Sequence, residues 1–127
     1  MPGKHLFEYA VVRVVPKVER EEFLNVGIVL YCKQHRYLHT FFHLDEERLK
    51  AFAPSLDLAE VQAYLAAFEK ISQGAKDGGP IAKLDLPSRF RWLTATRSTI
   101  VQVSKTHVGL CEDLEKAGQK LLEQLVL

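Results

Sequence analysis

Residues 6–15 of the chain read LFEYAVVRVV, a run rich in β-branched and aromatic residues. Such side chains fit the pleated surface of a β-strand. Both faces of the run are apolar apart from Glu8 and Arg13, so it predicts a central strand that is covered on both sides. Pro16 follows directly and ends the strand, because proline has no N–H to donate to a sheet.

Three more strands are predicted around this one. Residues 26–33 read VGIVLYCK and residues 37–44 read YLHTFFHL. The connection between them is too short for a parallel crossover, so the two segments should form an antiparallel hairpin. Residues 99–104 read TIVQVS, in which Thr99, Val101 and Val103 would share one face of a fourth strand.

Helices are predicted between the hairpin and the fourth strand. Asp45 is a typical N-cap for a short helix that ends before Pro54. Asp57 should begin a longer helix, for which Gly74 is a natural stop. Residues 74–87 hold three glycines and two prolines and should form one long loop, followed by a short helix over residues 87–94.

A last helix is expected at about residues 110–125, where apolar residues recur at nearly heptad spacing. Its stripe consists of Leu110, Leu114, Ala117, Leu121 and Leu125. Strands and helices do not alternate strictly along the chain. The sequence therefore predicts an α+β fold: a small, mainly antiparallel sheet of about four strands with helices packed on it and a long amphipathic C-terminal helix.

Length and composition limit the class of protein. A chain of 127 residues predicts a single domain over residues 1–127. Its 17 basic and 16 acidic side chains give a net charge of +1. This balance creates no long-range field, so we do not expect nucleic acid as a partner. Cys32 and Cys111 form no C-x-x-C pair and are expected to be free thiols.

The N-terminal segment and the longest apolar runs decide the expected location. Glu8 and Arg13 interrupt the first apolar stretch, so we expect no signal peptide. The longest apolar run is far shorter than a membrane span, so no membrane association is expected. The protein is therefore expected in the cytoplasm.

The most chemically dense segment is residues 89–99, which read RFRWLTATRST. It holds three arginines and the single tryptophan of the chain. Guanidinium groups bind carboxylate or phosphate with two parallel hydrogen bonds and stack on aromatic rings. The alternative is that the arginines form ion pairs on a solvated surface, which is the commoner arrangement. The candidate ligand-binding residues are Arg89, Arg91, Trp92, Arg97, Ser98, Thr99, Gln102 and His107.

Two functions remain open from the residues. The first is a non-catalytic binding or accessory module that presents residues 89–107 to a protein partner or a phosphate-bearing ligand. The second is a small enzyme acting on a phosphorylated or nucleotide-like substrate. It would need His107, Glu21 or Glu22 within hydrogen-bond reach of the arginines. No P-loop, G-x-G-x-x-G or G-x-S-x-G motif is present, so catalytic residues and cofactors stay unassigned.

The residues also offer weaker signals for a metal site and for a dimer. His39 and His43 would share a strand face, with Asp45, Glu46 or Glu47 beyond them, but this spacing is only weakly specific, and no metal ligand is predicted. The leucine stripe of residues 110–125 would suit a homodimer.

Two longer patterns resemble a known family. The first is YAVVRVVP at residues 9–16 with EREEFLNVGIVL at residues 19–30. The second comprises GPI at residues 79–81, RFRWLTA at 89–95, RST at 97–99, Gln102 and HVGL at 107–110. In this order they resemble the bacterial family known as domain of unknown function 3037. The resemblance implies a compact, stand-alone bacterial domain with no assigned catalytic residue, and it suggests a HipA-type kinase-like neighbour as a partner.

Overall fold

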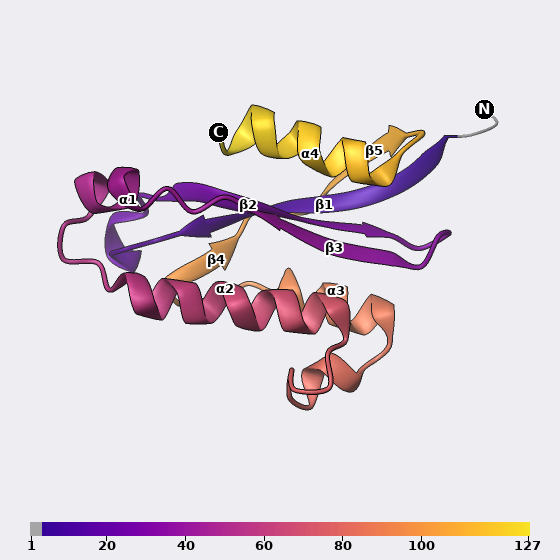
Figure 1. Cartoon of the computed structure of the whole chain (residues 1–127), viewed down its shortest axis with the longest axis horizontal. Coiled ribbons are helices and arrows are strands. Elements are labelled where there is room, and N and C mark those ends of the chain that lie inside the picture. Colours follow the sequence, from indigo (N-terminus) through magenta and orange to yellow (C-terminus); the bar gives the residue numbers. More distant parts are fainter. Residues whose placement is uncertain (1–3) are drawn as a thin grey trace.

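The chain folds into a five-stranded antiparallel sheet with helices on both faces (Figure 1). The computed structural model describes residues 4–127. The first three residues lie outside this range, and they belong to the segment in which we expect no signal peptide. The strands are β1 (His5–Val14), β2 (Leu24–Cys32), β3 (Tyr37–Phe42), β4 (Val101–Val103) and β5 (His107–Cys111).

Strand β1 is the central strand, as its sequence predicts. It pairs with β2 along one side and with both β4 and β5 along the other. Ala10, Val12 and Val14 are buried in a core cluster on one face of the sheet, whereas Phe7 and Val11 are buried in a second cluster on the opposite face. Two-sided burial is therefore confirmed for most of residues 6–15, with Leu6 as the exposed exception, and it requires a helical layer on each face.

Strands β4 and β5 behave as one edge strand with an interruption. Between the pairs Val12–Val103 and Tyr9–His107, β1 advances by three residues and its partner by four. The extra residue is accommodated as a bulge. Ser104 bridges it: the Val11 N–H donates to Ser104 Oγ at 2.8 Å, and the Ser104 N–H donates to the Val11 carbonyl at 2.9 Å.

Four α-helices complete the fold: α1 (Glu46–Phe52), α2 (Leu58–Gln73), α3 (Leu86–Leu93) and α4 (Leu114–Leu125). Short 3₁₀ turns lie at η1 (Val18–Arg20) and η2 (Ile81–Lys83). The predicted N-caps Asp45 and Asp57 accept backbone N–H groups of the first turn, and Gly74 ends α2 in the left-handed conformation. Both caps and the stop are confirmed.

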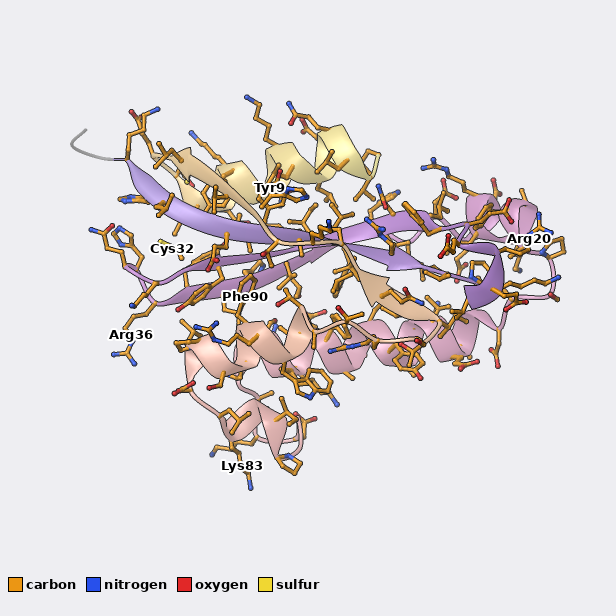
Figure 2. The ribbon with its side chains drawn as sticks, turned by 180° about the vertical axis from the view of Figure 1, so that it is seen from behind. Tyr9, Arg20, Cys32, Arg36, Lys83 and Phe90 are labelled. Carbon is orange, nitrogen blue, oxygen red and sulfur yellow. The ribbon has the colours of Figure 1, made fainter. Side chains whose placement is uncertain are left out.

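The helices form two layers. Helices α2 and α3 cover one face of the sheet, and α4 crosses the other (Figure 1). Phe90 of α3 points to the sheet and stacks on Tyr31 with ring centroids 4.8 Å apart (Figure 2). On the opposite face, Leu114, Ala117 and Leu121 of α4 pack against the core cluster. Most of the predicted leucine stripe is thus used inside the fold. None of the helices described is long and apolar enough to cross a membrane.

The prediction of a helix over residues 110–113 was wrong. They do not begin the last helix; residues 107–111 form the fifth strand, and the helix starts at Leu114 after the N-cap Asp113. The apolar spacing that suggested a helix includes Leu110, which lies in the strand opposite Leu6. Gly109 is required in this strand, because a Cβ there would lie 2.5 Å from the Phe7 ring.

We predict that Gly118→Ala destabilises the protein, although alanine usually stabilises a helix relative to glycine. Gly118 is buried in α4, and a Cβ at this position would overlap the ring of buried Phe41. Overpacking of this kind typically costs about 1–3 kcal/mol. The free energy of unfolding, measured by urea denaturation, should fall by an amount in this range.

Gln119→Ala, at the next and exposed position of α4, is the matched control and should change stability little. Adding Phe41→Leu to Gly118→Ala should restore part of the loss, because the smaller side chain makes room for the methyl group. A Gly118→Ala protein at least as stable as the wild type would contradict this packing.

Candidate functional site

The segment of residues 89–107 is divided between the two faces of the sheet. Arg89, Arg91 and Trp92 lie on α3, which packs with α2 on one face. His107 lies in β5 opposite Tyr9, and the two rings are in tilted contact with centroids 5.4 Å apart on the α4 face. The eight residues predicted as a ligand site therefore do not converge on one place.

Arg89 is used inside the fold. Its Nη1 donates to the carbonyl oxygens of Ile71 at 3.0 Å and Ser72 at 3.1 Å. These carbonyls belong to the last turn of α2, where the regular helical N–H donors have run out, although the Gly74 N–H also donates to the Ile71 carbonyl. The half-buried guanidinium thus fastens α3 to the C-terminus of α2 and complements the helix dipole there.

Arg97 is held by contacts within the fold, whereas Arg91 lies on the surface. Arg97 donates to the Trp92 carbonyl, and its guanidinium carbon lies 4.6 Å from the centre of the Trp92 ring. Burial lowers the pKa of Arg97. Trp92 itself remains 37% exposed and contacts Phe68 edge-on. Arg91 is exposed and forms no ion pair with any residue from 4 to 127.

Three further candidates lie in or next to the turn before β4. Thr99 Oγ1 donates to the Val101 carbonyl at 2.7 Å, and Gln102 Nε2 donates to the Thr99 carbonyl at 2.9 Å. Both side chains therefore stabilise the turn, while Ser98 is exposed. The enzyme hypothesis required His107, Glu21 or Glu22 beside the arginines. The sheet separates His107 from them, and Glu22 instead accepts a hydrogen bond from Arg20 in the β1–β2 connection and from no residue of 89–99.

A polar row does cross the α4 face of the sheet. Asn25 of β2, Arg13 of β1 and Gln102 of β4 are in register on three neighbouring strands. Asn25 Nδ2 donates to the Leu125 carbonyl at the end of α4, and the Arg13 guanidinium lies 3.9 Å from the centre of the Phe23 ring. Burial lowers the pKa of Arg13. In this row, Asn25 therefore holds the end of α4, while Arg13 contacts Phe23 and Gln102 binds the turn before β4.

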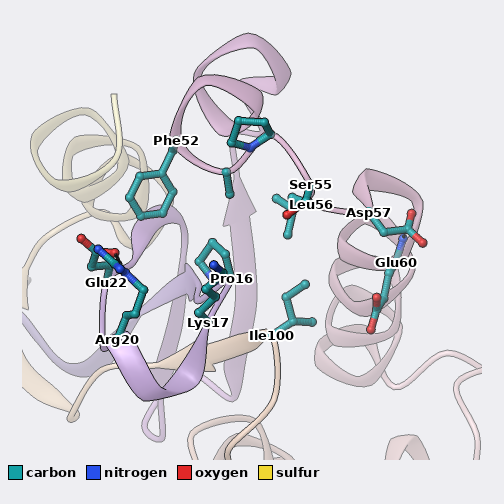
Figure 3. A pocket seen from close by; sticks show the side chains of 12 residues that line it. Pro16, Lys17, Arg20, Glu22, Phe52, Ser55, Leu56, Asp57, Glu60 and Ile100 are labelled. Atoms are coloured by element: carbon teal, nitrogen blue, oxygen red, sulfur yellow. Dashed lines mark hydrogen bonds and ion pairs between the residues drawn. The ribbon is translucent and has the colours of Figure 1, made fainter.

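A cleft of about 410 Å³ lies at one end of the sheet (Figure 3). One wall is the β1–β2 connection, and the other is the link between α1 and α2. Its lining residues are Pro16, Lys17, Arg20, Glu22, Phe52, Ala53, Pro54, Ser55, Leu56, Asp57, Glu60 and Ile100.

Local sequence explains both walls of the cleft. Pro16 ends β1, and a 3₁₀ turn follows that closes with Glu21 in the left-handed conformation at φ 56°. On the other side, α1 ends at Phe52 before Pro54, and Asp57 caps the start of α2. Two sharp chain reversals thus face each other and cannot pack as regular elements.

The cleft combines an apolar lining with charges of opposite sign. Pro16, Phe52 and Ile100 supply apolar surface. Lys17 and Arg20 project from one wall, whereas Asp57 and Glu60 lie on the other (Figure 3).

Two of these charged residues already have partners. The Arg20 guanidinium donates to Glu22 Oε1 at 2.6 Å, which lowers the pKa of Glu22 and raises that of Arg20. Asp57 Oδ1 accepts the Ala59 and Glu60 N–H groups.

Apart from Glu22, which the enzyme hypothesis named, the cleft residues were not among the functional residues predicted from the sequence. They come from three segments, residues 16–22, 52–60 and Ile100, each of which reads alone as an ordinary turn or strand entry. The available signal was Phe52, an aromatic residue directly before a Pro-containing turn. Within residues 4–127, no group of three or more His, Cys, Asp or Glu side chains is placed to hold a metal ion.

We predict that Arg89→Gln lowers the free energy of unfolding by about 1.5–3 kcal/mol, the range for hydrogen bonds from charged groups. Glutamine cannot reach both α2 carbonyls with a charged fork. Arg91→Gln on the same helix is the matched control and should change stability by less than about 0.5 kcal/mol. Urea denaturation monitored by circular dichroism measures both. Equal effects of the two substitutions would show that Arg89 does not hold α2 and α3 together.

Comparison with known proteins places the chain in a family. No curated protein and no solved structure matches it. A family model described as "Protein of unknown function (DUF3037)" matches residues 9–126. The match includes all of β2 to α4 and most of β1, together with every residue of the cleft. The chain therefore belongs to the DUF3037 family, as its two sequence patterns predicted.

Proposed function

We propose that this protein is a non-catalytic binding module and that its cleft receives a segment of a partner protein. The observation that carries the proposal is a cleft that combines apolar side chains with Lys17 and the Arg20–Glu22 pair on one wall and with Asp57 and Glu60 on the other. The proposal keeps the binding function expected from the sequence but moves the surface from residues 89–107 to the cleft. Bacterial origin, a cytoplasmic location and a kinase-like partner remain part of this proposal.

The apolar lining supplies affinity. Phe52 is 38% exposed at the rim, and Pro16 and Ile100 are partly exposed. Each Å² of apolar surface removed from water contributes about 25 cal/mol. A volume of about 410 Å³ holds one or two large side chains but not a folded element. A loop or extended segment with an apolar anchor residue fits these dimensions.

The charges supply orientation. Arg20 is already paired with Glu22, so Lys17 is the residue that favours an acidic group on one side of the anchor, and Glu60 favours a basic group on the other. Complementary charges at the rim of an interface fix direction and exclude wrong partners more than they add affinity. The cleft therefore suits a segment with an acidic residue and a basic residue on opposite sides of the apolar anchor.

The chemistry of the lining favours binding over catalysis. Ser55 carries the single hydroxyl among the lining residues, and neither histidine nor cysteine lines the cleft. A nucleophile needs an adjacent base, and general acid–base catalysis needs a group whose pKa is set near neutrality. Of the carboxylates in the cleft, Glu22 is paired with Arg20, Asp57 caps α2 and Glu60 is exposed.

We predict that Phe52→Ala and Lys17→Glu each weaken binding of the physiological partner. The partner would be captured from native lysate on immobilised wild-type protein, identified by mass spectrometry, purified and titrated by calorimetry. Loss of a central aromatic anchor typically costs more than about 1 kcal/mol, so Kd should rise at least about fivefold for Phe52→Ala. Lys17→Glu should also reduce the salt dependence of binding.

Lys33→Glu is the control for a change of surface charge. Lys33 is exposed beside the β2–β3 turn, which includes Arg36, and Figure 2 shows Arg36 at the opposite end of the molecule from Arg20. A partner that binds wild type, Phe52→Ala and Lys17→Glu with the same Kd would place the interface elsewhere and refute the cleft. Circular dichroism confirms that each variant is folded before titration.

A further inference from the structure

Strand β5 leaves one side of its backbone open. It pairs with β1, and within residues 4–127 no strand pairs with its other side. An edge strand presents unpaired N–H and C=O groups, which can pair with another chain. Natural proteins usually protect such edges with lysine, proline or a covering helix. Residues 107–111 contain neither lysine nor proline.

An exposed apolar patch lies beside this edge. Leu6, Val108 and Leu110 are 61%, 69% and 65% exposed. Leu6 pairs with Leu110 and Val108 with Glu8, so the three apolar side chains share one face of the β1–β5 ribbon. Helices α2 and α3 cover this face farther along β1, but they do not cover it at the end of β1 that holds Leu6.

The sequence around β5 is self-complementary in the antiparallel direction. Residues 105–113 read KTHVGLCED, with Gly109 at the centre. Two copies aligned antiparallel about Gly109 place Val108 of each copy opposite Leu110 of the other. Continued past the ends of β5 at His107 and Cys111, the same alignment places Lys105 opposite Asp113 and Thr106 opposite Glu112. Apolar residues thus meet in the middle, and opposite charges meet at both ends.

We propose that β5 pairs with β5 of a second copy about a twofold axis at Gly109, so that the two sheets become one continuous sheet. Leu6, Leu110 and Val108 of the second copy then form an apolar row across the junction, and the symmetry repeats the row. An isologous contact of this kind closes after two copies.

Neighbouring registers fit less well. To keep each side chain on the same face of the sheet, one copy must shift by two residues along the other. The nearest such registers place Val108 opposite Val108 of the second copy, or Leu110 opposite Leu110. Lys105 then lies opposite Cys111 or Glu115 and no longer opposite Asp113, which closes the strand as the α4 N-cap. The Gly109-centred register alone combines two apolar cross-pairs with the Lys105–Asp113 pair.

This dimer differs from one built on the leucine stripe. Leu114, Ala117 and Leu121 already pack on the sheet, so α4 keeps little of its stripe for a partner. The β5 contact needs no rearrangement of α4. It also uses no residue of the cleft, so its test is independent of the proposed binding function.

The first test is Val108→Lys. A charged residue in an edge strand opposes pairing with a second copy, and Val108 is exposed, so the monomer fold is retained. Leu84→Lys, at an exposed leucine after η2, is the matched control. Sedimentation velocity over a concentration series should show a monomer–dimer equilibrium for wild type and Leu84→Lys, and at least a tenfold higher dissociation constant for Val108→Lys.

The second test examines the register. Thr106→Lys creates an opposite-charge pair with Glu112 of the second copy, and Thr106→Glu creates a like-charge pair, each twice per dimer. The dimer dissociation constant should fall about threefold or more for lysine and rise similarly for glutamate. Both changes should vanish in 1 M salt, where the Debye length is about 3 Å.

Three results would overturn the proposal. The first is a wild-type protein that stays monomeric at millimolar concentration. The second is a dimer with the same dissociation constant in Val108→Lys and Leu84→Lys. The third is a shift in the same direction for both Thr106 variants. In each case circular dichroism and thermal melting show that the variant is folded.

Discussion

Backbone pairing along both sides of β1 is the constraint on which the rest of the structure depends. Each peptide group buried in a sheet must find a hydrogen-bond partner, and β1 obtains its partners from β2 on one side and from β4 and β5 on the other. Because β1 is apolar on both faces, the sheet must be covered twice. Helices α2 and α3 serve one face and α4 serves the other, so the helices cannot form one bundle.

The same constraint separates the residues that the sequence places together. The chain leaves α3 on one side of the sheet, enters the sheet itself as β4 and β5, and then crosses to the other side as α4. A segment that runs through three layers cannot keep its side chains on one surface. Arg89 and Arg97 therefore serve packing on the α2 side, and His107 meets Tyr9 on the α4 side. Candidate functional side chains that are close together in the sequence therefore lie on different faces of the sheet.

Features that depend on neighbouring residues in the sequence were predicted correctly. The run at residues 6–15, the caps Asp45 and Asp57 and the stop Gly74 depend on neighbours within a few residues, and each was correct. Strand β5 depends on pairing with β1, about a hundred residues earlier, and on the Phe7 ring beneath Gly109. Leu110 therefore fitted a helical pattern although it lies in a strand. The cleft was missed for a related reason, because Phe52 and Ile100 meet only after the sheet has formed.

The two edges of the sheet differ in how well helices cover them. On β3, Leu38 and Thr40 are buried on the α2 side and Phe41 is buried under α4, so helices overhang that edge from both faces. Strand β5 has no such cover. The cleft adjoins Pro16 and the dimer edge adjoins Tyr9, seven residues away along β1, which is roughly 23 Å at 3.3 Å per residue. A twofold dimer through β5 would leave both clefts open, and binding two segments of one partner would then gain from the high effective concentration of the second site.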